Sequence, residues 1–192
     1  MEKATPSHKP VILDILTRAF DTNRSVNYIA KQDSNRVQRI RGLMDYAFNL
    51  CNEFGDVWIS DDRSACALVL FTDKKRTTFR TILWDLRLAL LVIGPTRINK
   101  ILKREAMIKA NQPQHPFAYL WFLGVDSPAQ GKGAGSLLMK ELISLYKSKG
   151  LPIYLETSME VNIPFYEKLG FEVFNTVQLS YLLYMIRSVN RD

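Results

Sequence analysis

Apolar residues recur every three or four positions in three parts of the chain, which is the period of an amphipathic helix. The first two parts are residues 11–20 and 36–51. The third, 78–110, contains the pair Gly94-Pro95, and because both residues disfavour a continuous helix we expect two helices there. The pattern therefore predicts helices through much of the first half of the chain.

Strand patterns separate and follow these helices. Two short β-prone runs, 57–60 and 66–71, flank a polar turn and are typical of an antiparallel hairpin. The run 117–125 is apolar on both alternating faces, as expected for a central strand covered on both sides. The remaining pattern predicts a helix over 133–149, a strand over 152–157, a short helix over 162–169 and strands over 171–174 and 179–186. Together these elements indicate an α/β (α+β) fold with antiparallel parts.

Length and composition favour one folded unit. With 192 residues, 47% of them hydrophobic and 23% charged, the chain is typical of a single globular domain, which we expect over 1–192. The longest apolar run, 82–93, contains two charged residues and is shorter than the roughly 20 residues that cross a bilayer. The first residues lack the apolar core of a secretory signal, so we expect a cytoplasmic protein.

Cysteine and histidine are too sparse for several kinds of chemistry. Cys51 and Cys66 lie among apolar neighbours without a CxxC spacing, so we expect buried, reduced thiols. His8 and His115 are the only histidines, and they are not clustered with other metal ligands. The sequence therefore predicts no metal site and disfavours a nucleophile that depends on a Ser–His or Cys–His pair.

Positive charge is concentrated in one segment. The net charge is +7, and residues 74–109 hold ten Lys or Arg against two acidic residues. Such a segment attracts nucleic acid, an anionic membrane surface or a polyphosphate ligand, or it is a solvated helix face. Because only Phe79 and Trp84 lie among the cations, a platform for single-stranded nucleic acid is disfavoured. We expect no nucleic acid and no membrane as a partner.

A glycine-rich junction follows the predicted central strand. Residues 124–135 run from a strand end through a turn into a helix start, where free N–H groups and the helix dipole favour an anion. A Walker A loop is excluded because Ala134 follows Gly133, and a Rossmann loop fails because Ser136 stands where a glycine is needed. Taken alone, the loop predicts an anionic ligand, unless its glycines only allow close packing of the helix on the strand.

Two motifs resemble a known family. Residues 130–135 (QGKGAG) fit the Q-x-x-G-x-G/A signature of the GNAT N-acetyltransferases, and residues 162–171 (NIPFYEKLGF) fit their N-x-x-x-Y-x-x-x-G-F segment. The stretch 155–158 and a long helical insert at about 74–112 look like the branch that contains puromycin N-acetyltransferase. The resemblance implies a GNAT-like mixed, mostly antiparallel central sheet flanked by helices, with the insert before the central strand, and acetyl-CoA (CoA) as the cofactor.

The resemblance also implies which residues bind the cofactor. Backbone groups of Leu123, Gly124 and Val125 would pair with the pantetheine arm of CoA. Asn162 would contact the same arm, and Tyr166 would lie near its sulphur. The residues that would wrap the pyrophosphate are Gln130, Gly131, Lys132, Gly133, Ala134, Gly135 and Ser136.

Glu156 and Tyr166 have the chemistry of a catalytic pair. Acetylation of an amine needs a base, because an alkylamine with a pKa of about 10.4 is mostly protonated at neutral pH. Glu156 lies in a predicted strand, where burial would raise its pKa and let it act directly or through water; the alternative is a salt bridge. Tyr166 can protonate the leaving thiolate, or it packs under the glycine loop. The N–H of Val125 would stabilise the developing oxyanion.

The acceptor side carries fewer signals. In the branch that the sequence resembles, the first helix and the insert shape the acceptor pocket, which here would use Phe20, Tyr28 and Trp84. The alternative is that these aromatic residues belong to the core. A basic stripe within 97–104 would recognise an acidic acceptor or the 3′-phosphate of CoA, or do neither.

Three hypotheses follow for the function. The first is an acetyl-CoA-dependent N-acetyltransferase that acts on a small-molecule primary amine. The second has a peptide or protein amine as the acceptor. The third is a non-catalytic CoA-binding module, in which the apolar helix 82–93 forms a dimer or partner surface. This last reading leaves a homodimer open.

Overall fold

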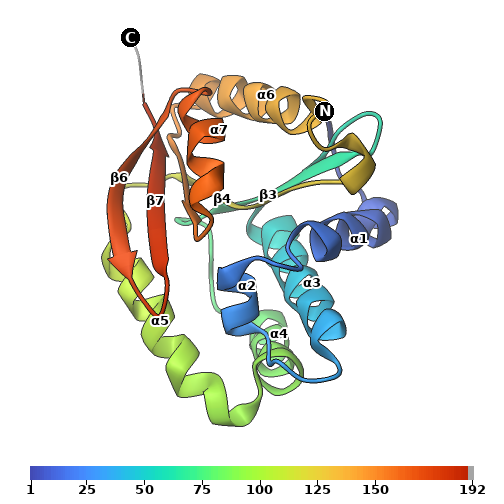
Figure 1. Ribbon diagram of the computed structural model, residues 1–192, viewed down its shortest axis with the longest axis vertical. Coiled ribbons are helices and arrows are strands. Elements are labelled where there is room, and N and C mark those ends of the chain that lie inside the picture. The colour runs from blue at the N-terminus through green and yellow to red at the C-terminus, as the bar shows by residue number, and fades with distance from the viewer. Residues whose placement is uncertain (190–192) are drawn as a thin grey trace.

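A seven-stranded sheet runs through the centre of the protein (Figure 1). The structure is a computed structural model that describes residues 1–189. The strand order is β1-β2-β3-β4-β5-β7-β6, and all neighbours are antiparallel except β4 and β5. The strands are β1 Glu2–Lys3, β2 Gly55–Ile59, β3 Ala65–Phe71, β4 Ala118–Val125, β5 Ile153–Thr157, β6 Phe171–Gln178 and β7 Leu182–Ser188. The predicted mixed, mostly antiparallel sheet is confirmed.

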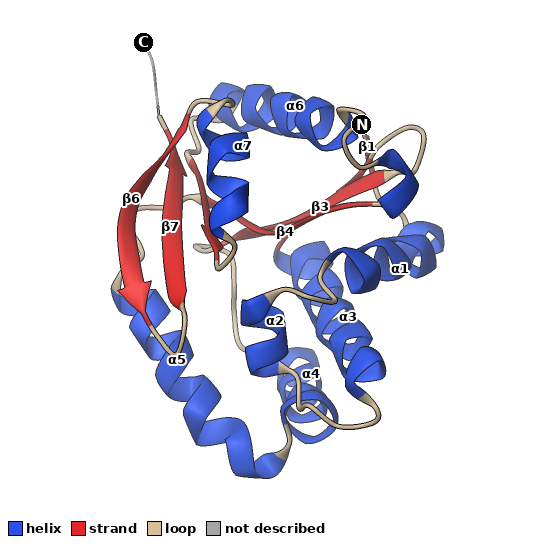
Figure 2. Ribbon diagram, in the orientation of Figure 1, coloured by secondary structure: helices blue, strands red, loops and turns tan. Residues whose placement is uncertain are grey.

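Helices cover both faces of this sheet (Figure 2). The helices are α1 Lys9–Ala19, α2 Arg24–Ile29, α3 Arg36–Phe54, α4 Phe79–Arg87, α5 Ile98–Ala110, α6 Ala134–Ser148 and α7 Ile163–Glu167. A π-helical turn, Leu88–Ile93, continues α4, and short 3-10 turns cover Pro6–His8, Pro95–Arg97, Ser127–Ala129 and Glu160–Asn162. Helices α1 and α3 pack on one face of the sheet, and α6 and α7 pack on the other. The central strand β4 is therefore apolar on both faces, as its pattern predicts.

The insert between β3 and β4 folds as two helices, as predicted. Helix α4 begins at a capping box: the Thr78 hydroxyl accepts from the Thr81 N–H at 3.2 Å, and the Thr81 hydroxyl accepts from the Thr78 N–H at 2.9 Å. The π-helical turn ends at Gly94, whose φ of +85° suits a glycine. Among residues 1–189, no helix combines the length and the apolar character needed to cross a membrane.

Some element bounds differ from the prediction. Helix α2 was not predicted, because its six residues are too few for a helical period to stand out; Asn23 starts it by accepting from the Val26 N–H at 3.1 Å. Strand β6 continues past 174 to Gln178, and the predicted strand at 179–186 begins only at Leu182. Strand β6 is a sheet edge whose second half carries exposed polar residues, and these hide its strand character.

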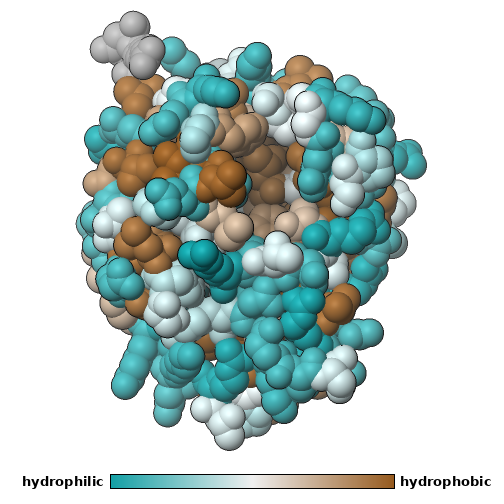
Figure 3. All heavy atoms as spheres, in the orientation of Figure 1, coloured by the Kyte–Doolittle hydropathy of each residue, from teal (hydrophilic) through white to brown (hydrophobic). Residues whose placement is uncertain are grey.

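The parallel strands β4 and β5 are joined at one end only. Within the described residues their paired positions are Ala118 with Ile153 and Tyr119 with Tyr154, although β4 continues for six more residues. Just beyond these pairs, Trp121 has no partner in β3 and forms a β-bulge, which bends β4. The two strands therefore diverge, and the β5-facing edge of β4 is open. Figure 3 shows an apolar hollow where Figure 1 places β3 and β4, beside α7.

Candidate active site

The glycine loop between β4 and α6 has the backbone geometry that the sequence predicts. Gly131 and Gly133 have φ values of +75° and +89°, and a Cβ on either would meet nothing within 4 Å. Their freedom therefore serves the backbone conformation and leaves open space beside the chain. Gly135 has a different task, because a Cβ there would lie 3.0 Å from Cγ2 of Val125. It lets α6 pack closely on β4.

The start of α6 presents backbone donors that have no backbone acceptor among residues 1–189. The N–H of Leu137 binds the Gly133 carbonyl at 2.9 Å, and no side chain caps this end of the helix. The donors without a backbone acceptor are the N–H groups of Gly131, Gly133, Ala134, Gly135 and Ser136. The exposed Lys132 adds a positive charge. Together with the positive end of the helix dipole, these groups form a cradle suited to a phosphate group.

Gln130 and the end of β4 connect this cradle to the open strand edge. The Gln130 side chain donates to the Val125 carbonyl at 3.2 Å, so it braces the loop. Leu123, Gly124 and Val125 pair with β3 on one side, which leaves their other edge toward the opening. Gly124 is needed for packing here, because a Cβ would lie 2.8 Å from the Leu16 side chain of α1.

Glu156 lies in β5 with hydrogen bonds to both carboxylate oxygens. Gln112 donates to Oε1 at 3.0 Å, and the Tyr119 hydroxyl donates to Oε2. Burial raises the pKa of Glu156, although the two hydrogen bonds and the nearby Arg104 oppose that effect. Within the described part of the chain, Glu156 forms no ion pair, so the salt-bridge alternative does not apply. A half-buried carboxylate with a raised pKa is a stronger base than one with an ordinary pKa.

Tyr119 and Gln112 were not identified from the sequence. Tyr119 lies in the apolar run of β4, where only its hydroxyl group indicates a role other than packing. Gln112 follows α5 and is far from Glu156 in the sequence, so no motif joins the two. Burial and the charge of Glu156 raise the pKa of Tyr119 well above its ordinary value. The Tyr119 hydroxyl therefore stays protonated and donates to the carboxylate.

Tyr166 is buried, and its hydroxyl has no hydrogen-bond partner among residues 1–189. Its ring packs edge-on against Phe165 and Phe171, with centroid distances of 5.1 and 5.9 Å. Burial raises the pKa of Tyr166, so the hydroxyl keeps its proton. Asn162, one turn earlier, places its amide 3.5 Å from the Thr157 hydroxyl, at the end of β5. A protonated hydroxyl without a partner is free to donate to a bound group.

Glu156 and Tyr166 lie on opposite faces of the sheet. Leu155 packs in one cluster with Tyr166 and α6. The next residue, Glu156, therefore projects to the face covered by α1 and α3, where its partner Tyr119 also packs. The opening between β4 and β5 separates the two groups. A molecule that enters the opening would therefore have the Glu156 carboxylate on one side and the protonated Tyr166 hydroxyl on the other.

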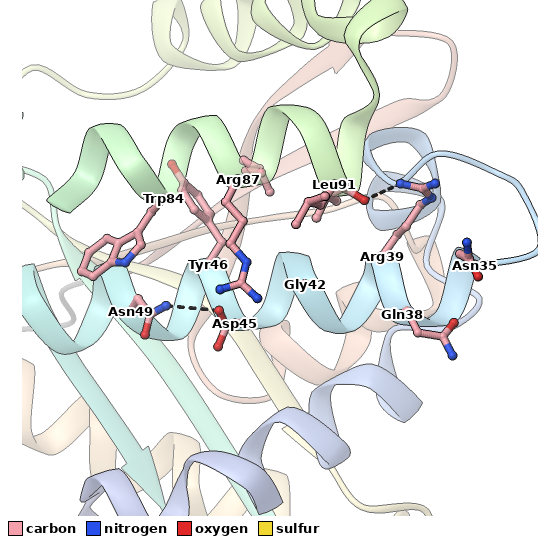
Figure 4. A pocket seen from close by; sticks show the side chains of 12 residues that line it. Asn35, Gln38, Arg39, Gly42, Asp45, Tyr46, Asn49, Trp84, Arg87 and Leu91 are labelled. Carbon is pink, nitrogen blue, oxygen red and sulfur yellow. Dashed lines mark hydrogen bonds between the residues drawn. The ribbon is translucent and has the colours of Figure 1, made fainter. Parts of the chain in front are cut away.

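The three aromatic residues predicted for the acceptor side lie in two places. Phe20 packs edge-on against Phe122 at 5.0 Å, and Tyr28 packs against Tyr181 at 5.5 Å. Trp84 instead lines a groove of about 370 Å³ between α3 and α4, where Figure 4 places it with Tyr46 and Arg87. Phe20 and Tyr28 therefore flank the face that carries Glu156, whereas Trp84 faces a separate groove.

In the basic stripe at 97–104, Arg97 and Arg104 turn inward, whereas Lys100 stays exposed. Arg97 donates to the Tyr28 and Ile29 carbonyls, and Lys100 lies 4.2 Å from the centre of the Tyr28 ring. Arg104 is only 7% exposed and donates to the Tyr181 hydroxyl at 2.8 Å. These contacts fasten α5 to α2 and to the turn between β6 and β7.

Comparison with known proteins agrees with this geometry. Residues 97–171 match the model of the Acetyltransferase (GNAT) family. A solved acetyltransferase from Corynebacterium glutamicum, described as histone acetyltransferase HPA2 and related acetyltransferase, superposes over 100% of this chain and 96% of its own, with a TM-score of 0.69 and 20% identity. The fold is that of the GNAT acetyltransferases.

Two further structures share the GNAT fold. Arylalkylamine N-acetyltransferase 2 from Aedes aegypti has a TM-score of 0.60 and 14% identity, over 97% of this chain and 95% of its own. Arabidopsis thaliana Naa50, solved with the bisubstrate analogue CoA-Ac-MVNAL, has a TM-score of 0.52 and 16% identity, over 98% and 96%. The first is named for a small amine, and the second holds CoA joined to a peptide.

A sequence relative supports the same family. An uncharacterized N-acetyltransferase of Schizosaccharomyces pombe is 40% identical over 62 residues, which is 32% of this chain. The match spans a quarter of the length of that relative, 25%. These findings show a GNAT fold and a match to the GNAT family model and to an N-acetyltransferase relative within part of the chain. They do not confirm the closer resemblance to the branch of puromycin N-acetyltransferase.

Proposed function

We propose that this chain is an acetyl-CoA-dependent N-acetyltransferase that acetylates a primary amine of a small molecule by direct attack. The observation that carries the proposal is the opening between β4 and β5, with Glu156 on one face of the sheet and Tyr166 on the other. A cradle of backbone donors lies at the end of the same opening.

The described residues fit the cofactor. The free N–H groups of residues 131 and 133–136 suit a pyrophosphate, and Gly131 and Gly133 keep side chains out of the adjoining space. The free edge of β4 at 123–125 offers backbone groups to the pantetheine arm, and Asn162 is placed at the end of β5 beside the opening. When bound, acetyl-CoA supplies an activated thioester. The Val125 N–H is our candidate donor to the acetyl carbonyl oxygen.

Glu156 is the proposed base. It takes the proton from the acceptor ammonium, directly or through a water, and its raised pKa suits that transfer. Tyr119 and Gln112 hold the carboxylate in place through its two oxygens. Phe20 and Tyr28 are the proposed aromatic walls for the acceptor on this face, and Trp84 remains a candidate only if the acceptor reaches the groove beside α4.

Tyr166 is the proposed acid on the other face. Its hydroxyl is protonated and has no partner among the described residues, so it is available to protonate the leaving thiolate. No buried side-chain oxygen among the described residues lacks a hydrogen-bond partner, so the unpaired hydroxyl of Tyr166 reaches solvent although the residue as a whole is 8% exposed. A hydroxyl that is open in this way can donate to a bound group, which packing alone would not require.

The acceptor class has one alternative. The likeness to Naa50, solved with CoA joined to a peptide, favours a peptide amine as the second candidate. A peptide would need to pass beside α5, which Arg97 fastens to α2 and Arg104 fastens to the β6–β7 turn. A small amine needs no such path, and this favours the small-molecule proposal.

The test is release of CoA thiol from acetyl-CoA with a panel of acceptors: puromycin, arylalkylamines, polyamines and short peptides. We expect turnover with one class of small amines, and at least roughly tenfold slower turnover in both Glu156→Gln and Tyr166→Phe. The matched controls are Glu172→Gln, an exposed strand carboxylate paired with Arg187, and Tyr154→Phe, a tyrosine in β5. Both controls should retain activity.

Other outcomes would overturn parts of the proposal. Turnover with peptides alone would replace the acceptor. If acetyl-CoA raises the Tm but no amine increases thiol release, the chain is a CoA-binding module without catalysis. If acetyl-CoA does not change the Tm either, the cradle at 131–136 does not bind the cofactor.

A further inference from the structure

Helix α4 and the π-helical turn that continues it expose an apolar face on the outside of the protein. Five residues at helical spacing form this face, which we call the apolar ridge. Their exposed fractions are 76% for Phe79, 52% for Ile82, 48% for Leu83, 53% for Leu86 and 49% for Leu90. No described residue covers the ridge. Single exposed apolar side chains are common on protein surfaces, but five along one helix mark an interaction site.

The ridge is fixed in place by the opposite side of the same helix. Thr81 and Val92 are each 3% exposed, and Asp85 accepts a hydrogen bond from Tyr46 of α3 at 2.6 Å. The π-helical turn lies so near α3 that a Cβ on Gly42 would come within 2.9 Å of Cγ2 of Val92. The ridge therefore cannot turn inward without breaking this packing.

Positive charge surrounds the ridge. Lys74, Lys75 and Arg76 are exposed immediately before α4. Arg80 and Arg87 lie along one flank of the ridge and are also exposed. Arg80 has an ion pair with Glu53 at 3.2 Å, and Asp85 already binds Tyr46. The exposed Asp73 lies beside Lys74 and leaves the cluster at 74–76 with an excess of positive charge. The partner must therefore supply negative charge beside an apolar surface.

We propose that the apolar ridge docks on an anionic lipid surface. The ridge side chains enter the boundary between headgroups and acyl chains, while the cations contact the headgroups. The charge distribution disfavours a second copy, because a two-fold interface would bring Arg80, Arg87 and the 74–76 cluster near their own counterparts. The ridge also lines no part of the groove between α3 and α4, so it does not offer the cavity that a protein side chain would fill.

Docking through α4 would leave the cofactor end of the molecule accessible. Figure 1 places α6 at one end of the long axis of the protein and α4 in the opposite half. The glycine cradle at the start of α6 would then face away from the lipid. This inference does not depend on the acetyltransferase proposal, and it revises the sequence-based expectation of no membrane partner.

The test is co-sedimentation of the full chain with phosphatidylcholine vesicles, with and without phosphatidylserine. We expect binding to the anionic vesicles only, weakened by salt. Two variants should each lower the partition coefficient by roughly tenfold: the single variant Leu86→Gln, and the double variant Lys75→Gln/Arg76→Gln. Leu137→Gln is the matched control, since Leu137 is a 61% exposed leucine on α6. It should bind as the unmodified chain does, and all variants should keep the same Tm.

Three results would overturn the proposal. The first is that the unmodified chain fails to bind anionic vesicles. The second is that Leu86→Gln binds them as strongly as Leu137→Gln. In the third, analytical ultracentrifugation detects a dimer that Leu86→Gln abolishes, which would assign the ridge to a second copy.

Discussion

The cofactor end and the acceptor side of the candidate active site are built in different ways. The cradle is one continuous segment, 130–136, in which neighbouring residues set the backbone geometry. The acceptor side joins Glu156 of β5, Tyr119 of β4 and Gln112, which follows α5. The first arrangement can be recognised in a sequence, whereas the second exists only once the insert has packed on the sheet.

The largest predicted effect is a loss of kcat that leaves CoA binding unchanged, which would distinguish the acceptor side from the cradle. Glu156→Gln should lower kcat by roughly 10²- to 10⁴-fold, because it removes the proposed base. The dissociation constant of CoA should not change, since the cradle does not contact Glu156. Steady-state kinetics and isothermal titration calorimetry measure the two quantities. A loss of CoA affinity in this variant would contradict the division of roles.

The next effect concerns the cradle alone. Gly133→Ala should weaken CoA binding by roughly tenfold, because the backbone at φ +89° must change or carry strain. Gly150→Ala is the matched control, since Gly150 has a φ of +65° and open space around it, at the other end of α6. Both variants should lose about 1–2 kcal/mol of unfolding free energy. Equal loss of CoA affinity in both would show that strain in α6, and not the cradle, governs binding.

A smaller effect should appear in stability against pH. Burial raises the pKa of Glu156 in the folded protein, so the folded state holds this proton more tightly than the unfolded chain. That stabilisation is complete below the ordinary value of 4.5 and is lost as the pH rises through the raised pKa. At neutral pH, the Tm of Glu156→Gln should therefore be a few degrees higher than that of the unmodified chain. Each kcal/mol of unfolding free energy shifts the Tm of a chain of this size by ~2–4 °C.

The control for that prediction is the same pair of proteins in acid. The difference in Tm should shrink as the pH falls toward 4.5, where both proteins carry a neutral side chain at this position. Thermal melts followed by circular dichroism measure it. A difference in Tm that is the same at every pH would mean that packing, and not the charge of Glu156, causes it.

The smallest effect tests whether α1 supports the loop. Arg18 binds Asp126 at 2.8 Å, which joins the end of α1 to the turn after β4. Both side chains are partly exposed, so Asp126→Asn should cost less than about 1 kcal/mol of unfolding free energy. Urea unfolding measures this. If Asp126→Asn lowers the CoA affinity as much as Gly133→Ala does, the cradle depends on tertiary contacts with α1.

The sequence predicted what depends on nearby residues. The helices of the insert and the break at Gly94-Pro95 follow from periodicity and turn chemistry, and the positive φ of Gly131 and Gly133 follows from the glycine pattern. The sequence did not identify Tyr119 and Gln112, because their role depends on β4 and β5 diverging after two pairs. It also could not tell that the basic stripe of α5 faces α2, since that direction is set by packing between distant elements.

Hydrogen–deuterium exchange of the chain with and without acetyl-CoA tests the central claim most directly, namely that the cofactor lies in the opening between β4 and β5. The account predicts slower exchange at amides 120–125 and 131–136, with no change in α4. Slower exchange confined to the groove between α3 and α4, around Tyr46 and Trp84, would contradict it.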